Sequence, residues 1–333
     1  MPEHVAPKSF TVSSRTKSGI WSFWGRDAIF CLVAVFLLGL FSEAGFAAKE
    51  PSRPPILGIA SVTIAAPGDT EGFYTKKLGI AAELNECMGI CLSHLDLSSV
   101  QELNVLDRKR FDELTQKPTG NNLVQITFET SDLGGLHSYL ASRGLQPTEI
   151  FKTGSNGTNP LFWVVDPELH QIGFVELKEP YHYNHSGKQV SGRLIHAGFV
   201  VHDRAAMDKF YKDTLGFHVY WHGGMKDDET DWVDMQVPDG TDWIEYMLNV
   251  PANADQRLRG VMNHIALGVP DIHAAAQQLL RNGMKLTEEP KIGRDGKWQL
   301  NLYDPDQTRV ELMEFTPTQK PCCSSYTGPH PKP

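Results

Sequence analysis

The chain has 333 residues, of which 41% are hydrophobic and 21% charged, a composition that excludes a disordered or collagen-like protein. This length predicts about two domains of roughly 150 residues each. Lys and Arg number 31 against 40 Asp and Glu, which gives a net charge of −9. No long basic run occurs, so nucleic acid is not an expected partner. Five cysteines are too few for a small scaffold held by disulfides.

The first fifty residues contain an uncharged apolar segment at 28–41. It is shorter than the about 20 residues that a membrane-spanning helix needs. Basic residues precede it and small residues follow it as far as Ala47, which is the pattern of a secretory signal. We therefore expect residues 1–47 to be a cleaved signal peptide, with an uncleaved N-terminal anchor as the alternative. The protein is then exported, periplasmic or secreted, and meets a membrane only through this leader.

Four cysteines follow the leader: Cys87, Cys91, Cys322 and Cys323. Four cysteines can pair in three ways, and the sequence does not choose among them. A zinc site built from all four is less favoured, because adjacent cysteines seldom both bind one ion with good geometry. We interpret them as an oxidised pair or as free thiols.

The remainder of the chain is a tandem duplication. Three landmarks occur twice, in the same order and at a nearly constant shift: FYTKKLG at 73–79 and FYKDTLG at 210–216, Asp132 with Gly144 and Asp271 with Gly283, and DPE at 166–168 and DPD at 304–306. Chance does not produce three such matches. The two halves are 56–180 and 190–317, joined by a polar linker and followed by a Pro-rich tail at 318–333.

Each half divides again into two modules of one plan. An apolar, β-rich segment at 194–201 precedes a helical pattern at 204–214 and three short β-type segments. The next quarter repeats this order, with its second strand expected at 285–289. The sequence therefore predicts an α+β protein of four βαβββ modules. Its sheets should be mixed or antiparallel, because only the first connection of each module contains a helix.

Histidine and glutamate occur at matched positions in the two modules of the second half. His196 and His264 lie in the first strands, each at the same distance before an aspartate, and Glu245 and Glu311 lie in the last strands. An approximate two-fold axis would bring the two His–Glu pairs around one cavity. Two imidazoles and two carboxylates suit one divalent ion: Ni, Co, Zn, Mn or Fe(II). A single histidine in a strand is more often structural, so the matched positions carry this interpretation.

These motifs resemble those of the vicinal oxygen chelate superfamily, which includes glyoxalase I, bleomycin-resistance proteins and extradiol dioxygenases. The resemblance covers about residues 56–317 and is carried by FYKDTLGF after a histidine strand and DPDQTRVELMEF at the end of a module. It implies two open eight-stranded cups, each built from two βαβββ modules, with a metal ion in the second. It carries the ligand positions onto His196, Glu245, His264 and Glu311, a set most similar to that of glyoxalase I.

The first half departs from this pattern. Gln125 stands where the second histidine is expected, and Gly173 stands where the second glutamate is expected. No histidine occurs around 59–61, and Glu102 matches the first glutamate only if a gap is inserted. We therefore expect residues 56–180 to be a degenerate, metal-free domain with a structural or substrate-shaping role.

Several functions remain open, all with a small-molecule partner. The resemblance implies a glyoxalase-like isomerase or lyase, in which the ion polarises two neighbouring substrate oxygens and Glu245 or Glu311 is the catalytic base. The alternative is an extradiol ring-cleaving Fe(II) dioxygenase, which needs only His196, His264 and Glu311. The presence of Glu245, with no histidine at 293–304, favours the first reaction. A non-enzymatic binding or resistance protein is the second alternative, and the complete ligand set argues against it.

Overall fold

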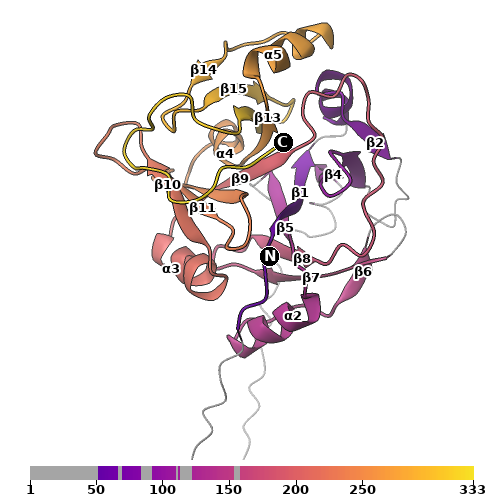
Figure 1. The fold of residues 1–333 in the computed structure, drawn as a ribbon, viewed down its shortest axis with the longest axis vertical. Helices are drawn as coiled ribbons and strands as arrows, with labels where there is room; N and C mark the ends of the chain where they lie inside the picture. Colours follow the sequence, from indigo (N-terminus) through magenta and orange to yellow (C-terminus); the bar gives the residue numbers. More distant parts are fainter. Residues whose placement is uncertain (1–51, 67–69, 84–91, 110–111, 113–121, 154–157) are drawn as a thin grey trace, which may run out of the picture. The chain divides into compact units, whose positions relative to one another are not determined.

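The computed structural model describes residues 52–66, 70–83, 92–109, 112, 122–153 and 158–333 (Figure 1). The expected leader and the Cys87 and Cys91 pair lie outside these ranges. Within them, no helix combines the length and apolar character needed to cross a membrane.

The first eight-stranded sheet, which we call the first cup, has the strand order β2-β3-β4-β1-β5-β8-β7-β6. Its elements are β1 (Gly58–Ala66), η1 (Phe73–Lys77), β2 (Ala81–Glu83), β3 (Leu92–Asp96), β4 (Glu102–Asp107), β5 (Leu123–Glu129), α2 (Leu133–Ser142), β6 (Phe151–Thr153), β7 (Asn159–Val165) and β8 (Gln171–Val175).

The second cup has the equivalent order, β10-β11-β12-β9-β13-β16-β15-β14. Its elements are β9 (Leu194–Val200), α3 (Arg204–Asp208), η2 (Lys209–Thr214), β10 (His218–Gly223), β11 (Trp232–Gln236), β12 (Trp243–Met247), α4 (Gln256–Met262), β13 (His264–Val269), α5 (Ile272–Arg281), β14 (Lys291–Ile292), β15 (Trp298–Tyr303) and β16 (Arg309–Glu314).

Both sheets are mixed, and the four βαβββ modules are confirmed. In every module the first and last strands pair in parallel, whereas the first strands of the two modules within each cup pair antiparallel. The strand expected at 285–289 is wrong, because the chain there is irregular and the two-residue β14 begins only after Pro290. Proline has no N–H to donate to a strand ladder, so pairing starts beyond it.

The repeated landmarks have structural roles at the ends of helices. Asp132, Asp203 and Asp271 cap α2, α3 and α5, each accepting a hydrogen bond from a backbone N–H in the first turn. Gly144 and Gly283 follow α2 and α5 with φ of 81° and 76°, a left-handed conformation that glycine adopts without strain. The duplication therefore repeats the signals that start and stop its helices.

Two buried tyrosines connect the cups in a reciprocal way. The hydroxyl of Tyr74, on η1, donates to Asp304 Oδ2 in the second cup at 3.0 Å. The hydroxyl of Tyr211, on η2, donates to Asp166 Oδ2 in the first cup at 3.1 Å. Both tyrosines are fully buried. We call these two pairs the reciprocal clamps; they join the repeated FY motif of each half to the DP motif of the other.

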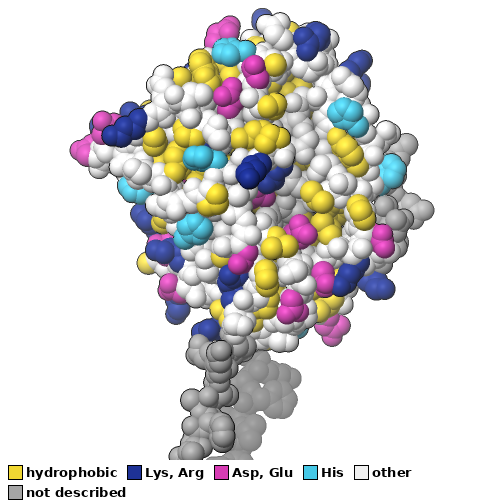
Figure 2. All heavy atoms as spheres, in the orientation of Figure 1, with side chains coloured by type: hydrophobic (Ala, Val, Ile, Leu, Met, Phe, Trp, Pro, Cys, Tyr) yellow, Lys and Arg dark blue, Asp and Glu magenta, His cyan; other side chains and the backbone are white. Residues whose placement is uncertain are grey.

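The C-terminal tail packs against the second cup (Figure 1). The backbone N–H of Cys322 donates to Arg294 O at 2.9 Å, beside β14, and that of Thr327 donates to Tyr220 O at 3.0 Å, on β10. Because β10 and β14 are the two edge strands, the tail bridges the open ends of the sheet. On the face shown in Figure 2, acidic and basic side chains are interspersed.

Candidate metal centre

The four expected ligands come from the four central strands of the second cup. On β9 and β13, Ala266 is the Cα partner of His196 and Gly198 that of His264. Glu245 of β12 also pairs with Gly198, and Glu311 of β16 pairs with Ala266. Adjacent strands in this register direct all four side chains to one face of the sheet.

Gly198 makes room for one of the histidines. A Cβ at this position would lie 2.0 Å from Cε1 of His264, so any larger residue would collide with the imidazole. The glycine thus allows the ring to lie across β9, toward His196.

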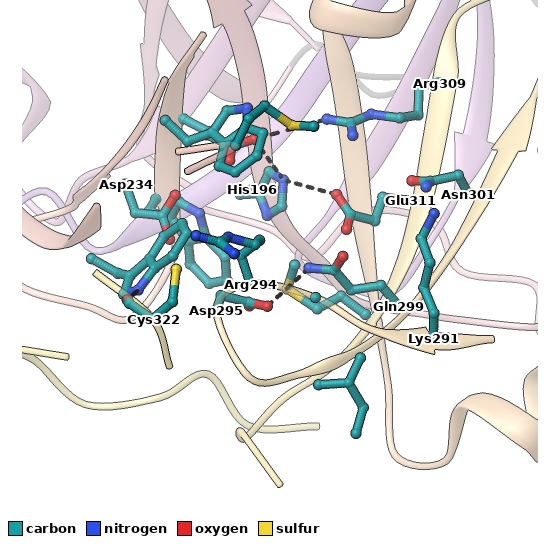
Figure 3. Close-up of a pocket in the computed structure, with 18 of the residues that line it drawn as sticks. His196, Asp234, Lys291, Arg294, Asp295, Gln299, Asn301, Arg309, Glu311 and Cys322 are labelled. Carbon is teal, nitrogen blue, oxygen red and sulfur yellow. Dashed lines mark hydrogen bonds and ion pairs between the residues drawn. The ribbon is translucent and has the colours of Figure 1, made fainter. Parts of the chain in front are cut away.

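The donor atoms converge on one point. The Nε2 atoms of His196 and His264 are 3.1 Å apart. Glu245 Oε2 lies 3.0 Å from Nε2 of His264 and 3.8 Å from that of His196. Glu311 Oε2 lies 3.8 Å and 3.7 Å from the same two atoms. Figure 3 shows His196 and Glu311 facing one another. A ligand atom from each of His196, Glu245 and His264 falls within 4.8 Å of the other two, close enough to share one ion.

Both histidines are in the chemical form that binds metals. The Met262 carbonyl lies 2.9 Å from Nδ1 of His264 and can only accept a hydrogen bond, so Nδ1 carries the proton and the Nε2 lone pair faces the centre. Burial lowers the pKa of His196 and of His264 well below the ordinary value, which keeps both imidazoles neutral. These residues therefore fit a divalent ion.

Arg309 is a functional candidate that the sequence analysis did not identify. Its Nη2 lies 2.7 Å from Nε2 of His264 and 3.9 Å from Glu245 Oε2. The guanidinium thus contacts the nitrogen that would face an ion, and coordination by His264 requires Arg309 to turn away. Arg309 precedes Glu311 by two positions on β16, and alternate residues of a strand share a face. The two-residue spacing from Glu311 was the sequence signal that could have identified Arg309 as a site residue.

Binding of a divalent ion is expected to release protons and to strengthen from pH 6 to pH 8. Burial raises the pKa of Glu245 and of Glu311 to about 7, against the opposing effect of Arg309. Below pH 7 each carboxyl must lose a proton before it can bind, so affinity should rise by about tenfold per pH unit for each proton released. Titration calorimetry in buffers of different ionisation enthalpy measures that number. Glu245→Gln should release one proton fewer, and a pH-independent affinity would contradict the assignment.

A cavity of about 520 Å³ opens beside the donor atoms. Its walls include three tryptophans, Trp221, Trp232 and Trp243, and basic residues that include Lys291 and Arg294. Figure 3 shows the polar side chains that surround it. The cavity therefore places aromatic surface and side chains of both charges next to the candidate metal centre.

Lys297 is a second residue that sequence reasoning missed. It is fully buried, and its Nζ has no hydrogen-bond partner among the described residues. The ammonium lies 4.4 Å from the ring centroid of Trp243, with Tyr220 and Tyr326 at 5.3 and 5.1 Å. Trp243 also packs on His196, with centroids 4.8 Å apart. Lys297 thus places a cation behind the aromatic wall of the site.

The equivalent positions of the first cup can be read from the strand register. Thr127 pairs with Ser61 and with Gly173, as Ala266 pairs with His196 and with Glu311. By the same register, the four positions equivalent to His196, Glu245, His264 and Glu311 are Ser61, Asn104, Gln125 and Gly173. None of them offers an imidazole or a carboxylate.

Glu102 is not the counterpart of Glu245. Glu102 pairs with Ser61 as Trp243 pairs with His196. It therefore lies two residues before the position that is equivalent to Glu245. The gap that would align the two glutamates does not occur. A metal-free first cup remains our prediction.

Comparison with known proteins gives one family and a set of similar folds. The family model of the Glyoxalase/Bleomycin resistance protein/Dioxygenase superfamily matches residues 193–312. No curated protein sequence matches the chain.

Similar solved structures include an extradiol ring-cleaving dioxygenase from B. fuscum, with 19% identity, a TM-score of 0.57, and coverage of 79% of this chain and 73% of that one. A homoprotocatechuate 2,3-dioxygenase from Arthrobacter globiformis is 17% identical, with a TM-score of 0.57 and coverage of 80% of this chain and 82% of that one. A mutant of the Brevibacterium fuscum homoprotocatechuate 2,3-dioxygenase is 20% identical, with a TM-score of 0.57 and coverage of 84% of this chain and 75% of that one. At these identities the likeness is one of fold.

Proposed function

Because the chain belongs, through residues 193–312, to the glyoxalase, bleomycin resistance protein and dioxygenase superfamily, we propose that it is an enzyme dependent on one divalent metal ion. Its substrate is a small molecule that binds the ion through two neighbouring oxygen atoms. The convergence of two neutral imidazoles and two carboxylates beside a cavity of about 520 Å³ carries this proposal. When bound, such an ion acts as a Lewis acid that favours loss of a proton from the substrate.

The chain's own residues would bind the substrate and move its proton. The tryptophans of the cavity offer flat apolar surface to a ring, and Lys291 and Arg294 offer positive charge to an acidic group. Glu245 and Glu311 are the proton acceptors nearest the site, and one of them can accept a substrate proton while the other holds the ion.

We propose extradiol ring cleavage of a catechol as the first candidate reaction. The similar dioxygenase structures cover 79% to 84% of this chain, a span too long for one cup alone. Two histidines and one carboxylate form a facial set that suits Fe(II). Ring cleavage needs only one of the two glutamates as a ligand, which leaves the other free to take a hydroxyl proton.

Proton transfer at a carbon beside a chelated oxygen, in a glyoxalase-like isomerase or lyase, is the second candidate. The observation that favours it is the fourth donor, since both glutamates reach the histidine nitrogens within 3.8 Å. Among the described residues that line the cavity, His196 is the only histidine, so a glutamate is the available acid or base. Two donors from each module leave two positions on a six-coordinate ion.

Protein purified without chelator is expected to contain iron and to consume one dioxygen per catechol, with homoprotocatechuate as the first probe. Both atoms of labelled dioxygen should enter the ring-opened product. One of the variants Glu245→Gln and Glu311→Gln should keep the ion while turnover falls by about 10²–10⁴-fold, because a proton acceptor is lost.

Two other results would each contradict ring cleavage. Nickel, cobalt, zinc or manganese, with solvent exchange of a substrate C–H and no oxygen uptake, identifies the isomerase or lyase. Protein that binds a small ligand but no metal would identify a non-enzymatic binding or resistance protein.

We also propose that residues 1–47 direct export, on the basis of their charge and apolar pattern alone. N-terminal sequencing of the protein from its native cell should find a start near Ala48. A chain that keeps Met1 and sediments with membranes would identify an anchor instead.

A further inference from the structure

Cys322 and Cys323 form a disulfide at the start of the segment that bridges the edges of the second cup. Cys322 lines the cavity, and Cys323 is exposed. A disulfide stabilises a fold mainly by closing a long loop in the unfolded chain, and a bond between adjacent residues closes almost none. Stabilisation of the fold therefore does not explain this bond.

We propose that the Cys322–Cys323 pair is a redox-active site that exchanges with dithiols and thereby controls the wall of the cavity. The pair lies between the two modules that carry the metal ligands. The Cys322 carbonyl accepts a hydrogen bond from Nε1 of Trp221 at 3.2 Å, at the β10 edge. Its N–H donates to Arg294 at the β14 edge, and the Ser324 hydroxyl accepts from the His222 N–H at 2.9 Å. A change at the pair therefore reaches both edges.

Arg294 lies beside the exposed sulfur of the pair, and a carboxylate oxygen of Asp227 lies within 4.8 Å of both sulfurs. Nη2 of Arg294 lies 3.6 Å from Sγ of Cys323 and 2.5 Å from Oδ1 of Asp227. A nearby guanidinium stabilises a thiolate, and the thiol that leaves as the more stable thiolate leaves faster. Cys323 is thus the leaving sulfur, and Cys322, which faces the cavity, is the sulfur attacked.

The dithiol reagent supplies the electrons and protons that the exchange needs. One thiolate of the reagent attacks Cys322 Sγ, the S–S bond breaks, and its electron pair leaves on Cys323 as a thiolate beside Arg294. The second thiol of the reagent then displaces Cys322 from the mixed disulfide. Two electrons and two protons have passed to the pair, and the reagent has become a disulfide.

The backbone gives the exchange a structural consequence. Cys323 has φ of 66°, a left-handed conformation that residues with a Cβ seldom adopt without a constraint. The disulfide supplies that constraint, so reduction lets residues 322 and 323 relax and loosens the contacts to Trp221 and Arg294. The candidate metal ligands lie on β9, β12, β13 and β16, whereas Trp221 lies on β10 and Arg294 follows β14. Reduction should therefore change the cavity wall and leave the metal content unchanged.

The test uses the full chain with Cys31, Cys87 and Cys91 replaced by serine, so that only the pair can respond. Millimolar dithiothreitol under native conditions should raise the thiol count from zero to two per chain, and removal of the reagent in air should reverse it. Hydrogen exchange in peptides covering 320–330 should then accelerate at least about tenfold, while peptides covering β9 and β13 and the bound metal stay unchanged. These readouts need no substrate, so they stand if the proposed reaction is wrong.

Two variants separate the proposal from incidental reduction. Adding Cys322→Ser and Cys323→Ser should abolish any response to the reagent. Arg294→Met should slow reduction about three- to tenfold, because the leaving thiolate loses its cation. A pair that stays oxidised in the folded protein, or a reduced pair with unchanged hydrogen exchange, would overturn the proposal.

Discussion

Replacing His264 by alanine is expected to remove the bound divalent ion and to lower turnover at least about 10³-fold, since metal-ion catalysis supplies several kcal/mol. His264 is fully buried, with its protonated nitrogen held by the Met262 carbonyl and its lone pair directed at the centre. His196→Ala should have the same effect. Metal analysis after gel filtration, with turnover on the identified substrate, measures both changes.

The matched control lies in the first cup. Gln125 occupies the position equivalent to His264, where its amide donates to the Thr127 hydroxyl at 2.8 Å. Gln125→Ala should therefore leave both the metal content and turnover near those of the parent protein. Full metal content in both histidine variants would refute the centre, and loss of metal in the Gln125 variant would refute the prediction of a metal-free first cup.

Tyr74→Phe is expected to lower the free energy of unfolding by about 1.5–3 kcal/mol, the range for a hydrogen bond to a charged group. The Tyr74 hydroxyl is the partner of Asp304 Oδ2, while Oδ1 accepts from backbone N–H groups of Asp306 and Thr308. Burial raises the pKa of Tyr74, so the hydroxyl stays a donor, and removing it leaves a buried carboxylate oxygen without its partner. Denaturant unfolding measures the loss, which corresponds to a fall in Tm of roughly 3–10 °C.

The other reciprocal clamp is the control for this variant. Asp166 Oδ2 also lies 2.8 Å from Nδ1 of His170, so Tyr211→Phe leaves that oxygen with a partner and should cost less. The pKa of Asp304 is raised to about 6 by burial, and the Tyr74 hydrogen bond opposes that rise. The loss in Tyr74→Phe should accordingly shrink as pH falls from 7.5 to 5. Equal losses in the two variants at both pH values would contradict this account.

The fold was predictable because its repeated residues have local roles. Asp271 caps a helix, Gly283 ends it, and both functions depend on a few neighbouring residues. The convergence of His196 and His264 was predictable for a similar reason, since matched positions in two modules become adjacent once their first strands pair. The sequence did not indicate the short strand β14 after Pro290, because two residues are too few to show an alternating pattern.

The remaining features of the site depend on contacts between distant segments. Lys297 follows a turn and has the pattern of a surface residue, but in the fold it is buried against the rings of Trp243, Tyr220 and Tyr326. The Pro-rich tail has no periodicity, and hydrogen bonds to β10 and to the turn after β14 hold it in place. No local pattern around Lys297 or Cys322 encodes these partners.

The two halves resemble a pair of subunits fused into one chain, and the reciprocal clamps hold each half against the other. Tyr74 and Asp304, like Tyr211 and Asp166, lie on helices and turns rather than at the four ligand positions. Substitutions at Ser61 or Gln125 therefore leave the association of the halves untouched. Fusion in this form lets one copy lack imidazoles and carboxylates at the ligand positions while it keeps supporting the other, so the two halves can diverge in sequence without coming apart.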